Sequence, residues 1–189
     1  MTNIENEFYN ANEAFEYFYK YISKYGTDFR DTKTLFNVGF AIHKPMLNVI
    51  VTEQRKWSKE YAEAEWQWYL SGDNHIKTLG DIYGKVPEIW KRMADDRGYV
   101  NSNYGWQWQR QKQLDKVISL LKRDKYTRQA AISIYDAKEF DEYTNDTPCT
   151  YAVQFTIVDN RLHMSVVMRS NDLWYGFCND QYCFSKLQE

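Results

Sequence analysis

The chain has 189 residues, with 24 Lys and Arg against 26 Asp and Glu, so its formal net charge is -2 at pH 7. This length allows one domain with a sizeable core and is too short for two large domains. The charge balance excludes a strongly basic surface for nucleic acid, and no apolar run approaches the roughly 20 residues of a membrane-spanning helix. The N-terminus lacks the pattern of a secretory signal, so we expect a cytoplasmic protein with free thiols.

The cysteine and histidine content does not favour a metal site. Three cysteines form no CxxC pair, and the three histidines are scattered along the chain. We therefore expect no bound zinc or other metal. Aromatic residues make up 17% of the chain, which suits either flat surfaces that stack on planar ligands or an aromatic core, and composition alone favours the core.

The N-terminal segment is predicted to form a helix and then a strand. Aromatic and aliphatic residues recur at helical spacing over residues 3–25, and Gly26 is placed to act as a C-cap. Residues 34–42 are rich in β-branched and aromatic side chains and predict a strand. Gly39 inside it indicates a bulge or a close approach of another segment.

The middle of the chain predicts three more helices. Residues 52–70 have one aromatic face with Glu65 at its border, and glycine follows the predicted end. Residues 87–97 begin with a proline, which is common in the first helical turn. Residues 109–122 carry an apolar stripe at helical spacing.

The last third changes to a strand pattern. Residues 129–135, 151–158 and 162–168 are β-branched or alternating, and Asp159-Asn160 has the composition of a tight hairpin turn. Helices followed by consecutive strands predict an α+β fold with a largely antiparallel sheet. Residues 181–189 resemble the start of a helix.

Two short motifs carry reactive groups. Cys149 follows a proline and precedes a strand, although a lone cysteine is more often a small packed side chain than a nucleophile. Residues 169–172 place Arg, Ser, Asn and Asp directly after a predicted strand. This set suits a phosphate and a hydrogen-bonding ring, and it equally suits a solvated loop with an internal Arg–Asp pair.

Several ordered segments resemble the thymidylate synthase superfamily, and within it the bacteriophage deoxycytidylate 5-hydroxymethylases. The resemblance spans residues 27–189. The matching segments are TKTLFNVG at 32–39, AEWQWYLSG at 64–72, EIWKRMA at 88–94, NSNYGW at 101–106, TRQAAISIY at 127–135, PCT at 148–150, QF at 154–155 and MRSNDLWYGFCND at 168–180.

The resemblance implies a thymidylate synthase-like α+β fold, in which a largely antiparallel or mixed sheet is flanked by helices and uses one face for homodimerisation. We expect residues 1–189 to form a single domain of this kind. The family continues past the position of Glu189 with elements that hold the sugar and close over the cofactor, so we expect the chain to lack the family's C-terminal part.

The resemblance also implies a covalent mechanism. Cys149 would add as a thiolate to C6 of a pyrimidine nucleoside monophosphate and make C5 nucleophilic. The cosubstrate 5,10-methylenetetrahydrofolate would supply the one-carbon unit. Water added at the resulting methylene gives a hydroxymethyl group, whereas hydride gives a methyl group.

The residues that match the family's phosphate site are cationic or hydroxylic. Arg169 and Ser170 match residues of the same subunit, and Arg128 matches an arginine that the family sends across the dimer interface. Gln129 departs from the pattern, because many relatives have a second arginine there. Arg30 is nearest to the family's mobile phosphate-loop arginine, about one residue out of register.

Proton transfer and cofactor binding are implied for five residues. Glu65 matches the glutamate that orders water at the base, and partial burial would raise its pKa towards neutrality. Tyr104 matches a tyrosine associated with proton removal from C5. Asp172 matches the carboxylate that holds the pterin ring, while Trp90 and Trp106 are stacking candidates that also suit the core.

Base specificity is predicted to depend on Asp180. An ungapped count from Arg169 places it where uracil-specific members have an asparagine, and a carboxylate can accept the N4 amino group of cytosine and stabilise a protonated N3. If the alignment with the family is shifted by one residue, Asn179 takes this position instead, and the predicted base becomes uracil. Asp180 can also be read as a helix N-cap. Gln154 in the QF segment is a further substrate-binding candidate.

The sequence therefore predicts a homodimeric hydroxymethylase for dCMP, active in the cytoplasm, or in the host cytoplasm if the gene is carried by a phage. One alternative is an enzyme of the same fold that methylates or hydroxymethylates dUMP. A second alternative is a nucleotide-binding module without catalysis.

Overall fold

The computed structural model describes residues 5–143 and 145–189. The chain divides into two compact units. The first unit contains the chain up to Ala62 together with Asp172–Leu187 and Glu189, and the second contains Glu63–Asn171 and Gln188.

The first unit begins with a short strand and a long helix. Helix α1 spans Ala11–Tyr25 and ends at Gly26, whose N–H donates to the Ile22 carbonyl at 2.8 Å, so the predicted C-cap is confirmed. The predicted start at residue 3 is wrong, because the described residues 5–10 are not helical. Asn10 is extended and its side chain accepts the N–H of Glu13 at 2.9 Å, which begins the helix at Ala11. Residues 3 and 4 lie outside the described residues.

The strand predicted over residues 34–42 is wrong for most of its length. Strands β2 (Thr27–Phe29) and β3 (Thr32–Thr34) form an antiparallel hairpin, and β4 (Ala41–Ile42) pairs in parallel with β1 (Glu7–Phe8). Asn37, between β3 and β4, has a φ of 55°, which interrupts extended structure. No atom lies within 4 Å of a Cβ built on Gly39, so this glycine marks neither a bulge nor a close approach.

Helix α7 completes the first unit. It spans Gly176–Gln188 and begins five residues before the predicted start at 181. Its residues Phe177 and Cys178 join a core that is formed largely by α1 and β1, which explains why this helix is stable although its own apolar pattern is weak. The buried members of this core are Phe8, Ala11, Ala14, Phe15, Phe18, Ile50, Phe177 and Cys178.

The helices of the middle segment are shorter than predicted. They are α2 (Lys59–Ser71), α3 (Ile76–Tyr83), α4 (Glu88–Met93), α5 (Tyr104–Gln109), the 3-10 turn η1 (Arg110–Lys112) and α6 (Gln113–Arg123). Helices α3 and α5 were not predicted.

Local hydrogen bonds explain the corrected helix boundaries. Helix α2 starts at Lys59 and not at residue 52. The hydroxyl of Ser58, directly before the helix, accepts the N–H of Tyr61 at 3.1 Å. Helix α4 stops at Met93, and Asp95 then accepts the backbone N–H groups of Arg97 and Tyr99 at 3.0 and 2.8 Å. Positive φ values at residues 111 and 112 separate η1 from α6.

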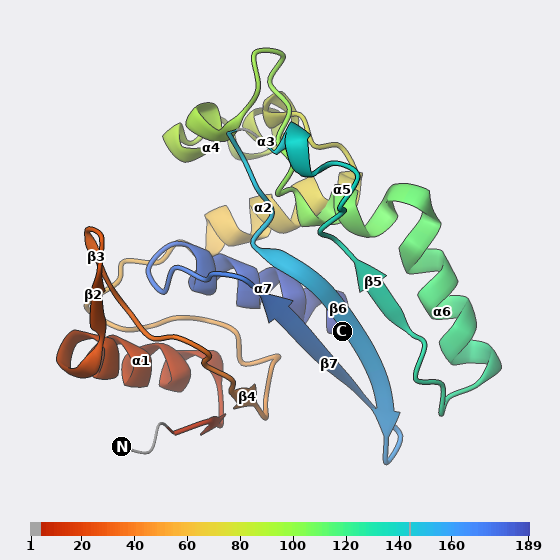
Figure 1. Cartoon of the computed structure of the whole chain (residues 1–189), viewed down its shortest axis with the longest axis horizontal. Coiled ribbons are helices and arrows are strands. Elements are labelled where there is room, and N and C mark those ends of the chain that lie inside the picture. Colours follow the sequence, from red (N-terminus) through yellow and green to blue (C-terminus); the bar gives the residue numbers. More distant parts are fainter. Residues whose placement is uncertain (1–4, 144) are drawn as a thin grey trace. The chain divides into compact units, whose positions relative to one another are not determined.

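The second unit contains a three-stranded antiparallel sheet in the order β5–β6–β7, and α6 lies alongside β5 (Figure 1). The strands are β5 (Ala131–Ser133), β6 (Thr150–Val158) and β7 (Arg161–Met168). Asp159 and Asn160 both have positive φ, 50° and 57°, so the predicted tight hairpin turn is confirmed. Strand β5 is shorter than the predicted 129–135.

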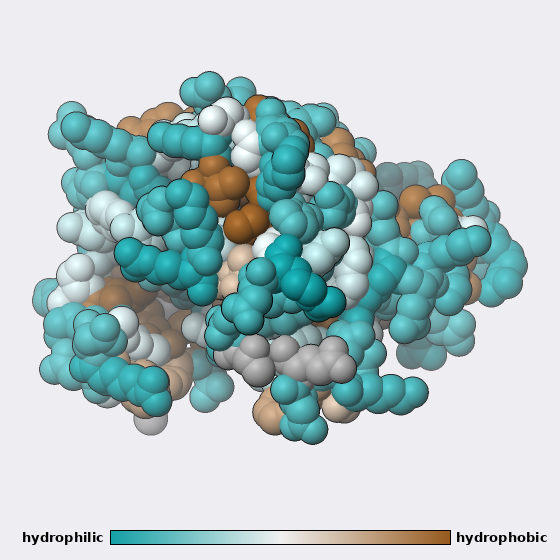
Figure 2. All heavy atoms as spheres, turned by 90° about the horizontal axis from the view of Figure 1, so that it is seen from above, coloured by the Kyte–Doolittle hydropathy of each residue, from teal (hydrophilic) through white to brown (hydrophobic). Residues whose placement is uncertain are grey.

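The mixture of helices with mainly antiparallel strands confirms the predicted α+β class. In the face shown in Figure 2, hydrophilic side chains cover most of the surface and apolar ones gather in small patches. Among the described residues, no helix has both the length and the apolar composition that crossing a membrane requires.

The backbones of helices α2 and α5 approach each other most tightly at a glycine, Gly105. A Cβ on Gly105 would lie 2.0 Å from the carbonyl oxygen and 2.2 Å from the Cα of Tyr69. Both atoms belong to backbone, so the contact cannot be relieved by turning a side chain. The absence of a side chain at Gly105 therefore sets how closely Tyr104 and α2 approach.

We expect Gly105→Ala to lower the free energy of unfolding by about 2 kcal/mol or more, because one of the two helices must move. Urea denaturation measures this change. Gly39→Ala is the matched control, because its new methyl group meets no atom within 4 Å, and it should stay within about 0.5 kcal/mol of wild type. Equal effects of the two substitutions would contradict the close approach of α5 to α2.

Candidate active site

The predicted nucleophile lies at one end of the β6–β7 pair. Cys149 is half-buried and directly precedes β6, and its carbonyl accepts the backbone N–H of Arg169 at 2.8 Å. The Arg169 guanidinium donates from Nε to the Pro148 carbonyl at 3.1 Å and from Nη2 to the Thr147 carbonyl at 2.8 Å. A cation is thus bonded to the two residues before the cysteine, and a nearby positive charge favours a thiolate.

Arg169 retains the capacity to bind an anion. A guanidinium has five N–H donors, and these two contacts use two of them. The residue as a whole is exposed, as is Ser170 beside it. The first two predicted phosphate ligands therefore lie side by side at the end of β7.

The other predicted substrate residues of this unit lie on and beside the sheet. Gln154 on β6 pairs with Ala131 of β5, and its Nε2 donates to the Arg128 carbonyl at 3.3 Å. Arg128 and Gln129 are both exposed just before β5. The Arg128 side chain is therefore on the surface, where a second subunit could be reached.

Glu65 and Tyr104 are connected through a third side chain. Glu65 is 3% exposed, and Oε1 accepts the Tyr69 hydroxyl at 2.9 Å. The Tyr69 ring packs edge-on to the Tyr104 ring with 6.0 Å between centroids. Tyr104 is the first residue of α5, whose N-terminus is capped by Asn103. The predicted carboxylate and tyrosine thus share one buried aromatic neighbour.

The two predicted stacking tryptophans have different environments. Trp90 is 8% exposed and packs edge-on against Trp68 at 5.1 Å, which is the contact of a core side chain. Trp106 is half-buried, and Cζ of Arg110 lies 5.4 Å from its ring centroid. The role of both residues in cofactor binding stays a prediction.

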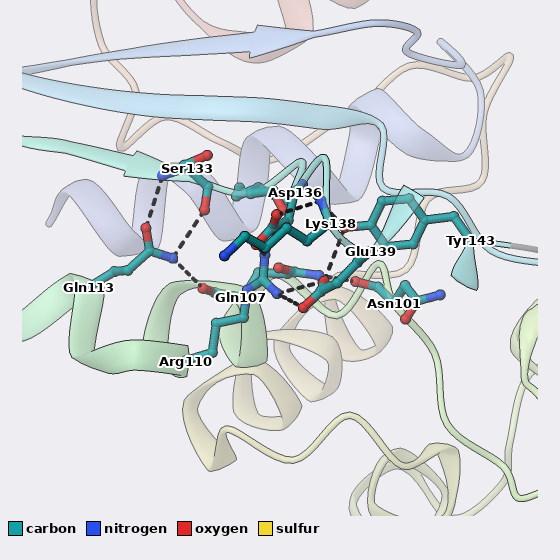
Figure 3. A network of polar contacts seen from close by, with 10 residues as sticks. Asn101, Gln107, Arg110, Gln113, Ser133, Asp136, Lys138, Glu139 and Tyr143 are labelled. Atoms are coloured by element: carbon teal, nitrogen blue, oxygen red, sulfur yellow. Dashed lines mark hydrogen bonds and ion pairs between the residues drawn. The ribbon is translucent and has the colours of Figure 1, made fainter. Parts of the chain in front are cut away.

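Arg110 is the centre of a polar network that sequence reasoning missed (Figure 3). Its Nη1 lies 2.6 Å from both carboxylate oxygens of Glu139, and Nη2 donates to the Ile134 carbonyl at 3.0 Å. Gln113 exchanges two 3.0 Å hydrogen bonds with the backbone of Ser133. The network fixes β5 and the segment after it to the kink between α5 and α6.

The remaining predicted site residues belong to the first unit. Asp172 is exposed, and Oδ1 accepts the N–H of Tyr175 at 2.5 Å ahead of α7. Arg30 occupies the turn between β2 and β3 with a φ of 55°. Asp180 lies inside α7, so its alternative role as a helix N-cap is wrong.

The structure gives Asn179 a contact that bears on the register question. Its Oδ1 accepts the indole N–H of Trp57 at 2.8 Å. Consecutive residues of an α-helix point about 100° apart, so the side chain of Asp180 leaves α7 in a different direction. This bond orients the Asn179 side chain, and the base-reading roles of Asn179 and Asp180 both stay predictions.

A buried carboxylate close to Cys149 was also missed. Asp146 is 2% exposed, and its Oδ2 accepts the backbone N–H and the hydroxyl of Ser102 at 2.7 and 2.8 Å. Burial raises the pKa of the Asp146 carboxyl, and the hydrogen bonds from Ser102 oppose that shift. Asp146 and Asn101 also line a cavity of about 600 Å³.

No local signal in the sequence indicates the contact between Asp146 and Ser102, because the two residues are 44 positions apart. The spacing of Glu65 and Tyr69 is different. Residues i and i+4 of a predicted helix lie on one face, so this pair was open to prediction. In the described part of the chain, no group of three or more His, Cys, Asp or Glu side chains is placed to hold a metal ion.

The chain is similar in sequence to known proteins. The family model described as thymidylate synthase matches residues 18–189. The deoxycytidylate 5-hydroxymethyltransferase of Enterobacteria phage T4 is 37% identical over 135 residues, which are 67% of this chain and 53% of that protein. The thymidylate synthase of Buchnera aphidicola subsp. Baizongia pistaciae (strain Bp) is 34% identical over 117 residues, 58% of this chain and 43% of that protein. The chain spans about half the length of these curated relatives.

Solved structures support the predicted fold. Thermostable thymidylate synthase A from Bacillus subtilis matches with a TM-score of 0.71 and 20% identity, covering 95% of this chain and 71% of that one. Thymidylate synthase from T4 phage matches with a TM-score of 0.59 and 22% identity, covering 70% and 51%. The predicted family resemblance and the thymidylate synthase-like α+β fold are therefore confirmed.

We expect iodoacetamide at pH 8 to alkylate Cys149 in the folded protein and to spare Cys178 and Cys183. Alkylation needs an accessible thiolate. Cys178 and Cys183 are 0% and 1% exposed, and burial raises the pKa of Cys178 to about 12. Peptide mass spectrometry locates the label, and a urea-unfolded sample, in which all three should react, is the control. Labelling of Cys178 at the rate of Cys149 would contradict this assignment.

Asp146 predicts a pH dependence of stability. Its pKa is raised in the folded state from an ordinary value of 3.8. Between the ordinary pKa and the raised pKa of Asp146, the folded chain holds more protons than the unfolded chain. The free energy of unfolding therefore falls as the pH rises from the first of these pKa values to the second. Asp146→Asn removes this titration. The stability of the variant minus that of wild type should therefore grow as the pH rises above the ordinary pKa of 3.8.

Urea denaturation at several pH values measures this difference. Asp141→Asn is the control, because Asp141 is exposed. Its difference from wild type should vary little with pH. If the Asp146→Asn difference stays constant or shrinks as pH rises, the raised pKa of Asp146 is wrong.

Proposed function

Because the chain belongs to the thymidylate synthase family, we propose that it transfers a one-carbon unit to C5 of dCMP and adds water, forming 5-hydroxymethyl-dCMP. The cosubstrate would be 5,10-methylenetetrahydrofolate, which supplies the methylene group and leaves as tetrahydrofolate. The protein would act in the cytoplasm, as a homodimer.

The observation that carries the catalytic proposal is the bonding of Arg169 around Cys149. The guanidinium holds the carbonyls of Thr147 and Pro148, which keeps a positive charge next to the cysteine. A thiolate stabilised in this way can form a bond from Sγ to C6 of the pyrimidine, and the electron pair of the 5,6 double bond moves to C5. At the end of the reaction Sγ leaves C6 and the double bond returns.

The phosphate of the nucleotide would be held by exposed groups at the same end of the sheet. Arg169 has unused guanidinium donors, and the Ser170 hydroxyl adds another. Arg128 would reach the phosphate of a second subunit, which makes the active protein a homodimer. Gln129 is neutral, so the site would hold fewer cations than that of many relatives. We assign Arg30 and Gln154 supporting contacts with the nucleotide.

Proton transfer would use the buried pair of Glu65 and Tyr104. The Tyr69 hydroxyl already donates to Glu65, which fixes the carboxylate in one orientation. An ordered water on that carboxylate can deliver and remove protons at the base. Tyr104, packed on the ring of Tyr69, would accept the proton that leaves C5.

The folate would be held by Asp172, Trp90 and Trp106. Asp172 is exposed and uses Oδ1 for the Tyr175 N–H, so the carboxylate can accept further N–H groups from a pterin ring. Trp106 is half-buried and offers an aromatic face. The assignment of Trp90 rests on the family resemblance, because this ring is 8% exposed and packs against Trp68.

The choice of cytosine rests on Asp180. A carboxylate accepts a hydrogen bond from the N4 amino group and stabilises a proton on N3, whereas O4 and N3–H of uracil suit an amide. The 37% identity to a deoxycytidylate hydroxymethyltransferase supports this choice. Identities of 34% and 30% to thymidylate synthases favour dUMP as the second candidate.

The test is tritium release from C5. Purified protein is incubated with methylenetetrahydrofolate and with dCMP or dUMP labelled with tritium at C5. We expect folate-dependent release from dCMP and a hydroxymethyl product by mass spectrometry, and Cys149→Ala should reduce release to background. Release from dUMP alone would replace the proposal with the second candidate. Nucleotide binding without release would indicate a non-catalytic module.

Two neighbouring substitutions test base recognition within the same assay. Asp180→Asn should lower the rate with dCMP by at least about a hundredfold and shift the preference towards dUMP. Asn179→Ala removes the acceptor of the Trp57 indole N–H, so it should lower the melting temperature and leave the ratio of the two rates unchanged. A changed ratio in Asn179→Ala would assign base reading to Asn179 instead.

A further inference from the structure

A set of buried hydrogen bonds joins the two segments that carry Cys149 and Tyr104. Oδ2 of Asp146 accepts from the backbone N and the Oγ of Ser102 at 2.7 and 2.8 Å, and the Asp146 carbonyl accepts from Asn101 Nδ2 at 2.9 Å. We call these three bonds the Asp146 clasp. Asp146 is 2% exposed and Ser102 is 8% exposed, so water does not compete strongly for the donors.

Each end of the clasp is close in sequence to a proposed reactive group. Ser102 is two residues before Tyr104, and Asn103 between them caps α5 by accepting the Trp106 N–H at 2.7 Å. Asp146 is three residues before Cys149. A displacement of the clasp would therefore move backbone that lies only two or three residues from each of these side chains.

The segment from Asp146 to Cys149 is also held from its other side. Arg169 bonds the carbonyls of Thr147 and Pro148, and its backbone N–H bonds the Cys149 carbonyl. The segment that carries the nucleophile is therefore held by hydrogen bonds from Arg169, just after β7, and from Asn101 and Ser102, just before α5. Loss of the clasp would leave this segment with the bonds from Arg169 and the bond from the Thr147 hydroxyl to the Tyr143 carbonyl at 3.3 Å.

The Asp146 carboxylate does not favour the stability of the fold. Its Oδ1 is buried and, among the described residues, has no hydrogen-bond partner. A buried oxygen without a partner typically costs about 1–3 kcal/mol. Arg169 is the charged group that offsets part of this cost through its positive charge. A side chain that lowers stability and joins two reactive segments favours a functional role.

We propose that Asp146 is a positioning residue that aligns Cys149 with Tyr104 through its hydrogen bonds to Ser102. This inference rests on the proposed function for its kinetic part. The clasp sets where Sγ lies relative to the tyrosine that takes the C5 proton, so its loss lowers the rate of the chemical step more than nucleotide binding.

The experiment compares three variants in the full chain. Ser102→Ala removes one of the two donors to Oδ2, Asp146→Leu removes the acceptor, and Asp146→Asn keeps an acceptor oxygen. Asp141→Asn is the control, an exposed carboxylate in the same part of the chain. The measurements are kcat and KM for tritium release, the rate of Cys149 alkylation, and the melting temperature.

The expected pattern separates positioning from stability. We expect kcat to fall about tenfold in Ser102→Ala and about a hundredfold in Asp146→Leu, with KM for dCMP within about twofold of wild type. Asp146→Asn should retain most of kcat, because its carbonyl oxygen accepts from Ser102. The alkylation rate of Cys149 should change in Ser102→Ala and Asp146→Leu and stay at the wild-type value in Asp141→Asn.

Three outcomes would overturn the inference. The first is a wild-type kcat in Ser102→Ala and Asp146→Leu at equal folded fraction, with only the melting temperature changed. The second is a loss in Asp146→Asn as large as in Asp146→Leu. If wild type releases no tritium from either nucleotide, the proposed function fails, and the alkylation rates still test the clasp; unchanged rates are the third outcome. If Asp146→Leu does not fold, Ser102→Ala and Asp146→Asn decide the question.

Discussion

The pairing of β6 with β7 determines where the reactive groups of the second unit are located. The tight turn at Asp159-Asn160 sets the register from Val158 opposite Arg161 to Ala152 opposite Val167, and an irregularity between Thr150 and Ala152 then shifts it by one residue, so that Thr150 lies opposite Met168. Cys149 precedes the first of these residues and Arg169 follows the second, so the nucleophile and the cation meet at the open end of the hairpin. A slip of one residue would turn every side chain of one strand to the opposite face. The site therefore depends on the two-residue turn at the other end of the strands and on the irregularity between Thr150 and Ala152.

Much of this arrangement could be predicted from local pattern. The strands and their turn have short-range signals, namely alternating β-branched residues and two residues that accept positive φ. The strand expected over residues 34–42 was wrong, because its composition is typical of a strand while Asn37 interrupts it. The Asp146 clasp joins residues 44 positions apart and leaves no periodic trace. Local sequence patterns predicted individual strands and their turn, whereas tertiary packing determined which polar side chains form hydrogen bonds.

The first unit shows how a single hydrogen bond bears on specificity. Asn179 and Asp180 are neighbours in α7, and either could read a pyrimidine if only the sequence is considered. The indole N–H of Trp57 bonds Asn179, so that amide already has a structural partner. The bond orients the Asn179 side chain, while Oδ1 keeps a second lone pair and Nδ2 keeps its donors. Asp180 stays the proposed base-reading residue on chemical grounds, because a carboxylate accepts the N4 amino group of cytosine.

Two of the buried polar atoms that have no hydrogen-bond partner among the described residues lie close in the chain to the proposed nucleophile. Among the described residues, those without a hydrogen-bond partner include Oδ1 of Asp146 and Oγ1 of Thr150, which lie on either side of Cys149 in the chain. Nε of Arg110 and Oε1 of Gln107 belong to the network that supports the preceding segment. Each such group lowers stability, and a core built for stability alone would replace it with an apolar side chain. The position of Asp146 and Thr150 on either side of Cys149 in the chain is expected if this part of the fold holds polar groups in place for chemistry, with packing elsewhere in the unit offsetting the cost.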